Sequence, residues 1–287
     1  MKPFLLISII WLFCAPLSHA TSVKYPQDFI HAGEKRLFYV NVPRNLPKNA
    51  PLIVALHGMG GQAHKMRYGL GLHDLASEMG FAALFPQGGM FGDHTTYWNS
   101  GQGLGNHDDL GFLTRLIDHI VQEHELDASR VYILGISNGA QMAYHLACHI
   151  PERIAGIAAV SGTITTQDWS ECHLNKSVSL LHIHGIEDPV MPFDGGVMWH
   201  SKGERYHAVP DLVEQWATQI GAVLTTAPEP LTSNIAITHY ETPEGVPIEL
   251  HSLSKFGHDW PNPENAGFSA ARLITSFFMG VVAKGRP

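Results

Sequence analysis

The sequence of 287 residues predicts an α/β fold in which one open, mostly parallel β-sheet carries helices on both faces. Two observations lead to this prediction. Short apolar segments rich in β-branched residues alternate along the chain with segments whose apolar residues recur at helical spacing. Several of the short segments are apolar without interruption, as strands covered on both faces must be. We find no internal repeat and no linker, so a single domain is expected after the first twenty residues.

The expected elements follow in order along the chain. The predicted strands are Arg36–Val42, Pro51–Gly58, Phe81–Gln87, Arg130–Ile136, Ile154–Gly162, Ser179–Gly185 and Ile248–Leu253. The predicted helices are Leu110–Leu126, Gly139–His149, Val209–Ile220 and Phe268–Ala283. Asp108 or Asp109 is the expected N-cap of the first helix, whose apolar residues lie on one stripe. Gly88–Gly105 and Phe193–His207 are expected to be long loops, and loops of that length are often functional.

The first twenty residues differ from the rest of the chain. Lys2 is followed by the apolar segment FLLISIIWLF, interrupted only by Ser8, and then by APLSHA. This segment is too short to span a bilayer, and small residues follow it, which is typical of a secretory signal. We therefore expect residues 1–20 to be a signal peptide cleaved after Ala20, leaving residues 21–287 as a secreted or periplasmic domain. A retained membrane anchor is the alternative.

The charge of the chain bears on its binding partners, and its cysteine content bears on disulfide formation. The chain has 18 Lys and Arg against 26 Asp and Glu and no basic run, which argues against nucleic acid or a membrane surface as a partner. Beyond the signal only Cys148 and Cys172 are left. Two cysteines in an exported protein favour one disulfide, with two separate buried thiols as the alternative.

Reactive groups in a parallel sheet lie beyond the carboxyl ends of the strands. Four predicted strands are followed there by distinctive residues, namely His57–Gly61 (HGMGG), Gly135–Gly139 (GISNG), Asp188 and His258. A serine, an acid and a histidine thus occur in the chain order found in α/β-hydrolases. The sequence accordingly predicts an α/β-hydrolase fold, without a large cap domain, in which Ser137, Asp188 and His258 are catalytic.

Each residue type suits that chemistry. A serine hydroxyl needs a base to take its proton, and histidine is the base whose pKa lies close to neutral pH. A carboxylate on the far ring nitrogen fixes the tautomer of the histidine. Asp194 is the alternative acid. Gly135 and Gly139 would permit the strained turn at the serine. A glycine turn with a solvated serine is the non-catalytic alternative.

The developing oxyanion needs backbone donors. The N–H of Asn138, at the start of the following helix, and the N–H of Met59 in the HGMGG loop are expected to supply them.

The sequence pattern around the other histidines favours structural roles over catalytic ones. His57 is expected to brace the oxyanion loop, and His182 and His184 to pack or hydrogen-bond on their strand. His145 and His149 have the i, i+4 spacing of a metal pair, but no third ligand has a recognisable spacing, so no metal is expected.

Three aromatic residues could line the substrate pocket or belong to the core instead. They are Trp98, Phe193 and Trp260.

Five segments together resemble a known family. They are LHGMGG, DDLGFLTRLID, GISNGAQMAYHLACHIPERIAGIAAVSG, HIHGIEDPVMPFDGG and GHDWP. In this order they resemble the secreted polyhydroxybutyrate depolymerase and feruloyl esterase-like α/β-hydrolases, related to carbohydrate esterase family 1. The resemblance runs from about Leu37 to Phe278. It implies the same triad and oxyanion donors, a Cys148–Cys172 bridge, and no metal or organic cofactor.

The resemblance also implies the substrate class, which is carboxylic esters such as hydroxyalkanoate oligomers, feruloylated or acetylated polysaccharides, and small esters. The HGMGGQAHKM loop departs from the family, where a cysteine or a more polar run is common. No separate binding module is visible, which favours soluble oligomers or small esters over crystalline polyester.

Two alternatives to a secreted serine esterase are a serine peptidase of the prolyl-oligopeptidase kind and a homologue that binds a glycan or polyester without turnover. No gating domain is visible for the first, and the ordered acid and base argue against the second.

Overall fold

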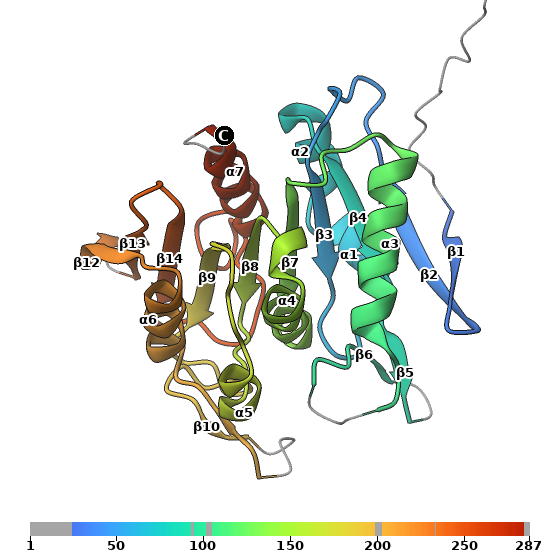
Figure 1. The fold of residues 1–287 in the computed structure, drawn as a ribbon. Helices are drawn as coiled ribbons and strands as arrows, with labels where there is room; N and C mark the ends of the chain where they lie inside the picture. Colours follow the sequence, from blue (N-terminus) through green and yellow to red (C-terminus); the bar gives the residue numbers. More distant parts are fainter. Residues whose placement is uncertain (1–24, 93–94, 102–104, 199–202, 233, 284–287) are drawn as a thin grey trace, which may run out of the picture.

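The structure is a computed structural model that describes residues 25–92, 95–101, 105–198, 203–232 and 234–283. The expected signal peptide lies outside these residues. Ten strands form one sheet in the order β1-β2-β4-β3-β7-β8-β9-β14-β13-β12 (Figure 1). They are β1 (Gln27–His31), β2 (Glu34–Asn41), β3 (Leu52–Leu56), β4 (Ala82–Pro86), β7 (Val131–Ile136), β8 (Gly156–Val160), β9 (Ser179–Gly185), β12 (Val223–Thr232), β13 (Ile235–Glu241) and β14 (Pro247–Leu253).

The predicted open, mostly parallel sheet is confirmed for its centre. The six strands from β4 to β14 run parallel to their neighbours, whereas β1, β2, β13 and β12 add antiparallel pairs at the two edges. All seven predicted strands are present within a few residues of their expected bounds. The strands that the sequence did not predict lie at the edges of the sheet or outside it.

Helices cover both faces of the sheet, as expected from its uninterrupted apolar strands. In Figure 1, α3 (Asp109–Glu123), α4 (Asn138–His149) and α6 (Val209–Gln219) lie in front of the sheet. Behind it lie α1 (Ala63–Gly69), α2 (Leu72–Met79) and α7 (Ala270–Ala283). Strand β3 shows how both cores are built, since Leu52, Val54 and Leu56 face the first layer and Ile53 and Ala55 face the second.

Helix α3 begins where the sequence indicated. The side chain of Asp108 accepts a hydrogen bond from Gly111 N at 2.8 Å, so Asp108 rather than Asp109 is the N-cap. Asp109 instead forms a buried ion pair with Arg36 of β2, with 2.5 Å between Oδ1 and Nη2.

Short elements occupy the expected loops beyond the carboxyl ends of the strands. Gly88–Gly105 contains the antiparallel pair β5 (Gly89–Phe91) and β6 (Thr95–Tyr97), and Phe193–His207 contains β10 (Gly196–Val197) and β11 (Arg205–Tyr206). Both expected loops therefore contain a short antiparallel pair. The remaining elements are the short helices α5 (Thr166–Ser170) and η1 (Pro151–Arg153).

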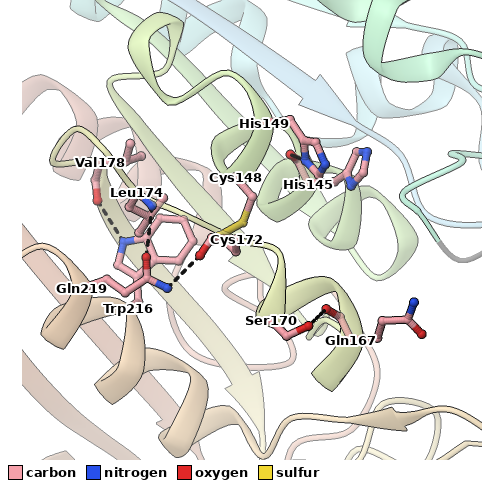
Figure 2. Close-up of a disulfide and its surroundings, with 10 residues drawn as sticks. All are labelled: His145, Cys148, His149, Gln167, Ser170, Cys172, Leu174, Val178, Trp216 and Gln219. Atoms are coloured by element: carbon pink, nitrogen blue, oxygen red, sulfur yellow. Dashed lines mark hydrogen bonds between the residues drawn. A yellow bond between two sulfur atoms is a disulfide. The ribbon is translucent and has the colours of Figure 1, made fainter.

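The expected disulfide between Cys148 and Cys172 is confirmed (Figure 2). It joins the last turn of α4 to the segment after α5. The side chain of Gln219 in α6 holds the same segment, donating to Cys172 O and accepting from Leu174 N, both at 3.0 Å. Within the described chain, no helix is both long and apolar enough to cross a membrane.

Candidate active site

Ser137 lies in a sharp turn between β7 and α4. Its φ is 56°, in the left-handed region that non-glycine residues rarely adopt. A methyl group on Gly135 would lie 2.2 Å from Gly139 O, and one on Gly139 would lie 2.2 Å from Leu56 O. The two glycines therefore let the first turn of α4 pack directly against β7 and the end of β3, as the sequence indicated.

The HGMGG loop passes beside this turn. A methyl group on Gly58 would lie 3.4 Å from Ser137 Cβ and 3.9 Å from Ser137 Oγ. The backbone N–H groups of Met59 and Asn138 donate no hydrogen bond to any residue that the structure describes. That of Asn138 belongs to the first turn of α4, where the helix dipole favours negative charge. Both donors are thus available to a ligand.

His57 braces the loop, as expected. Its Nε2 accepts the backbone N–H of Gly88 at 3.0 Å, so Nδ1 carries the proton and donates to Gly58 O at 2.8 Å. Gln87 also lies at 2.9 Å from Nε2. Burial lowers the pKa of His57 to about 4, although the hydrogen bond to Gly58 opposes this. A neutral imidazole held in this way cannot serve the serine as a base.

Of the two alternatives left open for Trp98, pocket or core, the structure favours the core. The side chain is fully buried. Its backbone N–H donates to Asn138 Oδ1 at 2.7 Å, its carbonyl accepts from Asn138 Nδ2 at 3.0 Å, and its indole donates to His57 O at 2.9 Å. Trp98 therefore joins the turn at Ser137 to the HGMGG loop.

His258 and Asp188 meet across two loops. His258 Nδ1 lies 2.8 Å from Asp188 Oδ2, which leaves Nε2 of His258 for a proton acceptor role. The other carboxylate oxygen of Asp188 accepts the backbone N–H groups of Val190 and Met191, both at 2.8 Å. Asp194, the alternative acid, is exposed.

Asp188 is held in its ionised form. Burial by itself would raise the pKa of Asp188, but hydrogen bonds from His184, His258 and Met191 N–H outweigh burial and place the pKa well below its ordinary value. The carboxylate of Asp188 is therefore charged at neutral pH.

The loop carrying His258 packs beside Ser137 through the strand between them. Ser137 N donates to Val160 O at 2.8 Å, and the next residue, Ser161, donates from its Oγ to Asp259 O at 3.4 Å. Within the described part of the chain no hydrogen bond joins Ser137 Oγ to His258. Such bonds are often long before substrate binds.

The other two candidate pocket residues have partly buried side chains. Phe193 packs on the ring of His184, with 5.9 Å between ring centroids, and Trp260 packs against the core on the α7 face. Neither arrangement decides whether these residues touch a substrate, and that assignment stays a prediction.

The rings of His145 and His149 lie next to each other along α4, with centroids 4.0 Å apart and planes tilted by 40° (Figure 2). Among the described residues no group of three or more His, Cys, Asp and Glu side chains is arranged to hold a metal ion.

Sequence reasoning missed one residue of this site, Gln87, which hydrogen-bonds to His57 and whose Oε1 accepts from Ala63 N at 2.9 Å. Gln87 directly follows β4, so the same search beyond the strand ends could have found it. The histidines on β9 were expected to pack or hydrogen-bond, and His182 and His184 do both inside the core.

Comparison with known proteins places this geometry among esterases. Residues 37–215 match the model of the family described as esterase PHB depolymerase. A bifunctional acetylxylan esterase/xylanase of Neocallimastix patriciarum is 30% identical over 161 residues, covering 56% of this chain and 22% of that protein. A probable feruloyl esterase C of Aspergillus niger is 30% identical over 176 residues, covering 58% of this chain and 60% of that protein. The chain therefore matches only part of the length of these curated relatives.

Solved structures agree on the fold. An acetyl xylan esterase from Aspergillus awamori aligns with a TM-score of 0.65 at 18% identity, covering 90% of this chain and 99% of that one. A putative alpha/beta hydrolase from Agrobacterium tumefaciens aligns with a TM-score of 0.54 at 17% identity, covering 90% and 95%. The expected α/β-hydrolase fold is thereby confirmed.

Proposed function

The chain belongs to the PHB depolymerase family of esterases, and on that premise we propose that it is a secreted serine esterase with Ser137 as its nucleophile. One observation carries the proposal. The left-handed turn at Ser137 lies beside a loop in which the N–H of Met59 donates to none of the described residues. At the same edge of the sheet, Nδ1 of His258 lies 2.8 Å from the buried carboxylate of Asp188.

In the proposed reaction His258 Nε2 takes the proton of Ser137 Oγ while that oxygen attacks the ester carbonyl. The tetrahedral intermediate collapses, and the leaving alcohol receives the proton from His258. Water then attacks the acyl-enzyme, with His258 again taking the proton. As the second tetrahedral intermediate collapses, His258 returns that proton to Ser137 Oγ and the carboxylic acid departs. Asp188 holds His258 with its proton on Nδ1 and stabilises the imidazolium formed in each half-reaction.

The backbone N–H groups of Met59 and Asn138 bind the oxyanion in this proposal. Because His57 and Trp98 fix the loop and the turn before substrate arrives, the donors need no rearrangement as charge develops. Removal of one such donor typically costs about 100- to 1,000-fold in kcat.

We propose carboxylic esters as the substrates: acetyl or feruloyl esters of polysaccharide, hydroxyalkanoate oligomers, or small esters. Relatives named as acetylxylan and feruloyl esterases support this range. Residues 21–287 would then be the catalytic domain, released after cleavage near Ala20. Kinetics on acetylated xylan, methyl ferulate, hydroxybutyrate oligomers and p-nitrophenyl esters of rising acyl length would rank these substrates.

The Ser137→Ala variant tests the nucleophile. We expect hydrolysis of p-nitrophenyl acetate to fall by at least about 1,000-fold, with an unchanged circular dichroism spectrum. A fluorophosphonate probe should label the wild type and not the variant. Full activity in the variant would disprove the role of Ser137. Absence of both hydrolysis and labelling in the folded wild type would favour a binding homologue, and turnover of peptides but not esters would favour a peptidase.

A further inference from the structure

A chain of buried hydrogen bonds leads from helix α4 to the carboxylate of Asp188. Tyr144 Oη lies 2.6 Å from His182 Nδ1, and His182 Nε2 lies 3.0 Å from His184 Nδ1. At the far end His184 Nε2 lies 2.8 Å from Met191 O and 3.4 Å from Asp188 Oδ2. The tyrosine and both histidines are at most 1% exposed.

The acceptors at the Asp188 end of this series of hydrogen bonds determine which atom carries the hydrogen in each of them. Because a carbonyl oxygen and a carboxylate can only accept, His184 Nε2 must carry a hydrogen. In a neutral imidazole Nδ1 of His184 then accepts, so Nε2 of His182 is the donor. Nδ1 of His182 in turn accepts, and Tyr144 donates its hydroxyl hydrogen. All donors therefore point toward Asp188.

Burial favours the neutral forms of His182 and Tyr144. It lowers the pKa of His182 well below its ordinary value and raises the pKa of Tyr144 well above its ordinary value. Trp216 packs edge-on against the ring of Tyr144, and Phe193 packs edge-on against the ring of His184, so aromatic side chains contact both ends of the hydrogen-bonded series. Buried polar groups that satisfy one another in series form a rigid unit.

We propose that Tyr144, His182 and His184 are positioning residues that hold Asp188 against His258, an inference that rests on the proposed esterase function. His184 Nε2–H binds Met191 O and so fixes the turn whose amides bind Asp188 Oδ1.

The same N–H faces Oδ2, the oxygen that accepts from His258. The hydrogen stays on Nε2 of His184 because Nδ1 of His184 accepts from His182 Nε2. Tyr144 fixes the tautomer of His182 in the same way, by donating to His182 Nδ1.

A purely structural role would give different results from a positioning role. Three variants and one control separate the two. His184→Leu removes the donor, His184→Gln returns an N–H close to the place of Nε2, and Tyr144→Phe removes one hydroxyl while keeping the ring. Ser179→Ala is the matched control, because Ser179 is a buried residue of the same strand whose Oγ bonds to Ala155 O, far from Asp188 along β9.

For p-nitrophenyl acetate we expect His184→Leu to lower kcat by about 10- to 100-fold with little change in KM, since a displaced catalytic group costs rate rather than binding. Tyr144→Phe should lower kcat by about 2- to 10-fold, which corresponds to the net free energy of one hydrogen bond. His184→Gln should recover most of the loss, and Ser179→Ala should keep wild-type kcat. The acid limb of kcat/KM should move to lower pH in His184→Leu, because a loosened carboxylate stabilises the imidazolium less.

A second measurement does not depend on activity. The low-field proton resonance of His258 Nδ1–H reports the hydrogen bond to Asp188, and it should shift or broaden in His184→Leu and Tyr144→Phe but not in Ser179→Ala. Wild-type kcat and an unmoved resonance in folded Tyr144→Phe would overturn the proposal, as would equal losses in His184→Gln and His184→Leu. If the wild type proves inactive, the proposed function fails, and the resonance still decides whether the chain positions Asp188.

Discussion

Ser137 occupies a backbone conformation that costs about 1–3 kcal/mol for a residue other than glycine. The neighbouring strand and helix hold it there, since its N–H donates to Val160 O at 2.8 Å and its carbonyl accepts from Ala140 N at 2.9 Å. A serine in an unconstrained turn would relax to negative φ. Close packing of the backbone at Gly135 and Gly139, where a Cβ would lie 2.2 Å from a carbonyl oxygen, helps to hold the turn in place.

Asp188→Asn should lower kcat by about 10,000-fold, because an amide at this position forces the wrong tautomer on His258. The orientation of the amide is determined in advance. Its oxygen must stay where the N–H groups of Val190 and Met191 donate, so its NH2 faces His258 Nδ1. His258 then carries its proton on Nε2 and cannot take one from Ser137. Steady-state kinetics with p-nitrophenyl acetate measure the effect.

The control is Asp194→Asn, whose carboxylate is exposed, and we expect wild-type kcat from it. A loss in Asp194→Asn together with less than a tenfold loss in Asp188→Asn would show that the acid had been assigned to the wrong residue.

At the scale of elements, the central strands and β2 were predictable, whereas β1, β12 and β13 were not. Strands β3, β4 and β8 are buried along their whole length, so their sequences are apolar throughout. Strand β13 is half-exposed at every position, and its sequence IAITHYE carries no clear alternation. Strand β12 contains Pro228 and Pro230, which argue against a strand. Its pairing with β13 is irregular, with three register shifts.

The positions of candidate site residues were predictable wherever they follow directly from the end of a strand. Ser137, Asp188 and His258 lie beyond strand ends as expected, and their catalytic roles stay a proposal. The bracing of the HGMGG loop by His57 was predictable in the same way. The burial of Trp98 could not be predicted, because it depends on how the segment before α3 folds back over α4. The order of the hydrogen bonds from Tyr144 to His184 depends in the same way on the packing of α4 against β9.

The disulfide between α4 and the segment after α5 should contribute roughly 3.5 kcal/mol to the free energy of unfolding, from the chain entropy of a loop with sequence separation 24. Urea unfolding with and without a reducing agent measures this contribution. The Cys148→Ala/Cys172→Ala double variant should unfold like the reduced wild type and should not respond to reductant. Equal midpoints for the oxidised and reduced wild type would contradict the expectation, and would mean that Gln219 and the α6 contacts hold the segment unaided.

For the molecule as a whole, the buried His57 and the half-buried His145 couple stability to pH. Burial lowers the pKa of both His57 and His145 from 6.5 to about 4, with the hydrogen bond to Gly58 opposing it at His57 and the neighbouring His149 adding to it at His145. Between about pH 4 and pH 6.5 these two histidines bind protons in the unfolded chain but not in the folded chain. The stability due to these residues is therefore fully present above pH 6.5 and is lost as the pH falls toward 4.

We therefore expect the free energy of unfolding to fall from pH 6.5 toward pH 4 by up to about 1.4 kcal/mol per pH unit for each of these histidines. Urea unfolding at pH 7, 6 and 5 gives the slope. His145→Gln should reduce the slope of the unfolding free energy against pH by up to the contribution of one histidine. Esterase activity should stay intact, because His145 lies two helical turns beyond Ser137 along α4. Exchange of the exposed His64 for Gln is the matched control and should keep the wild-type slope. A slope that is equally steep in His145→Gln would mean that the protons taken up on unfolding bind elsewhere in the chain.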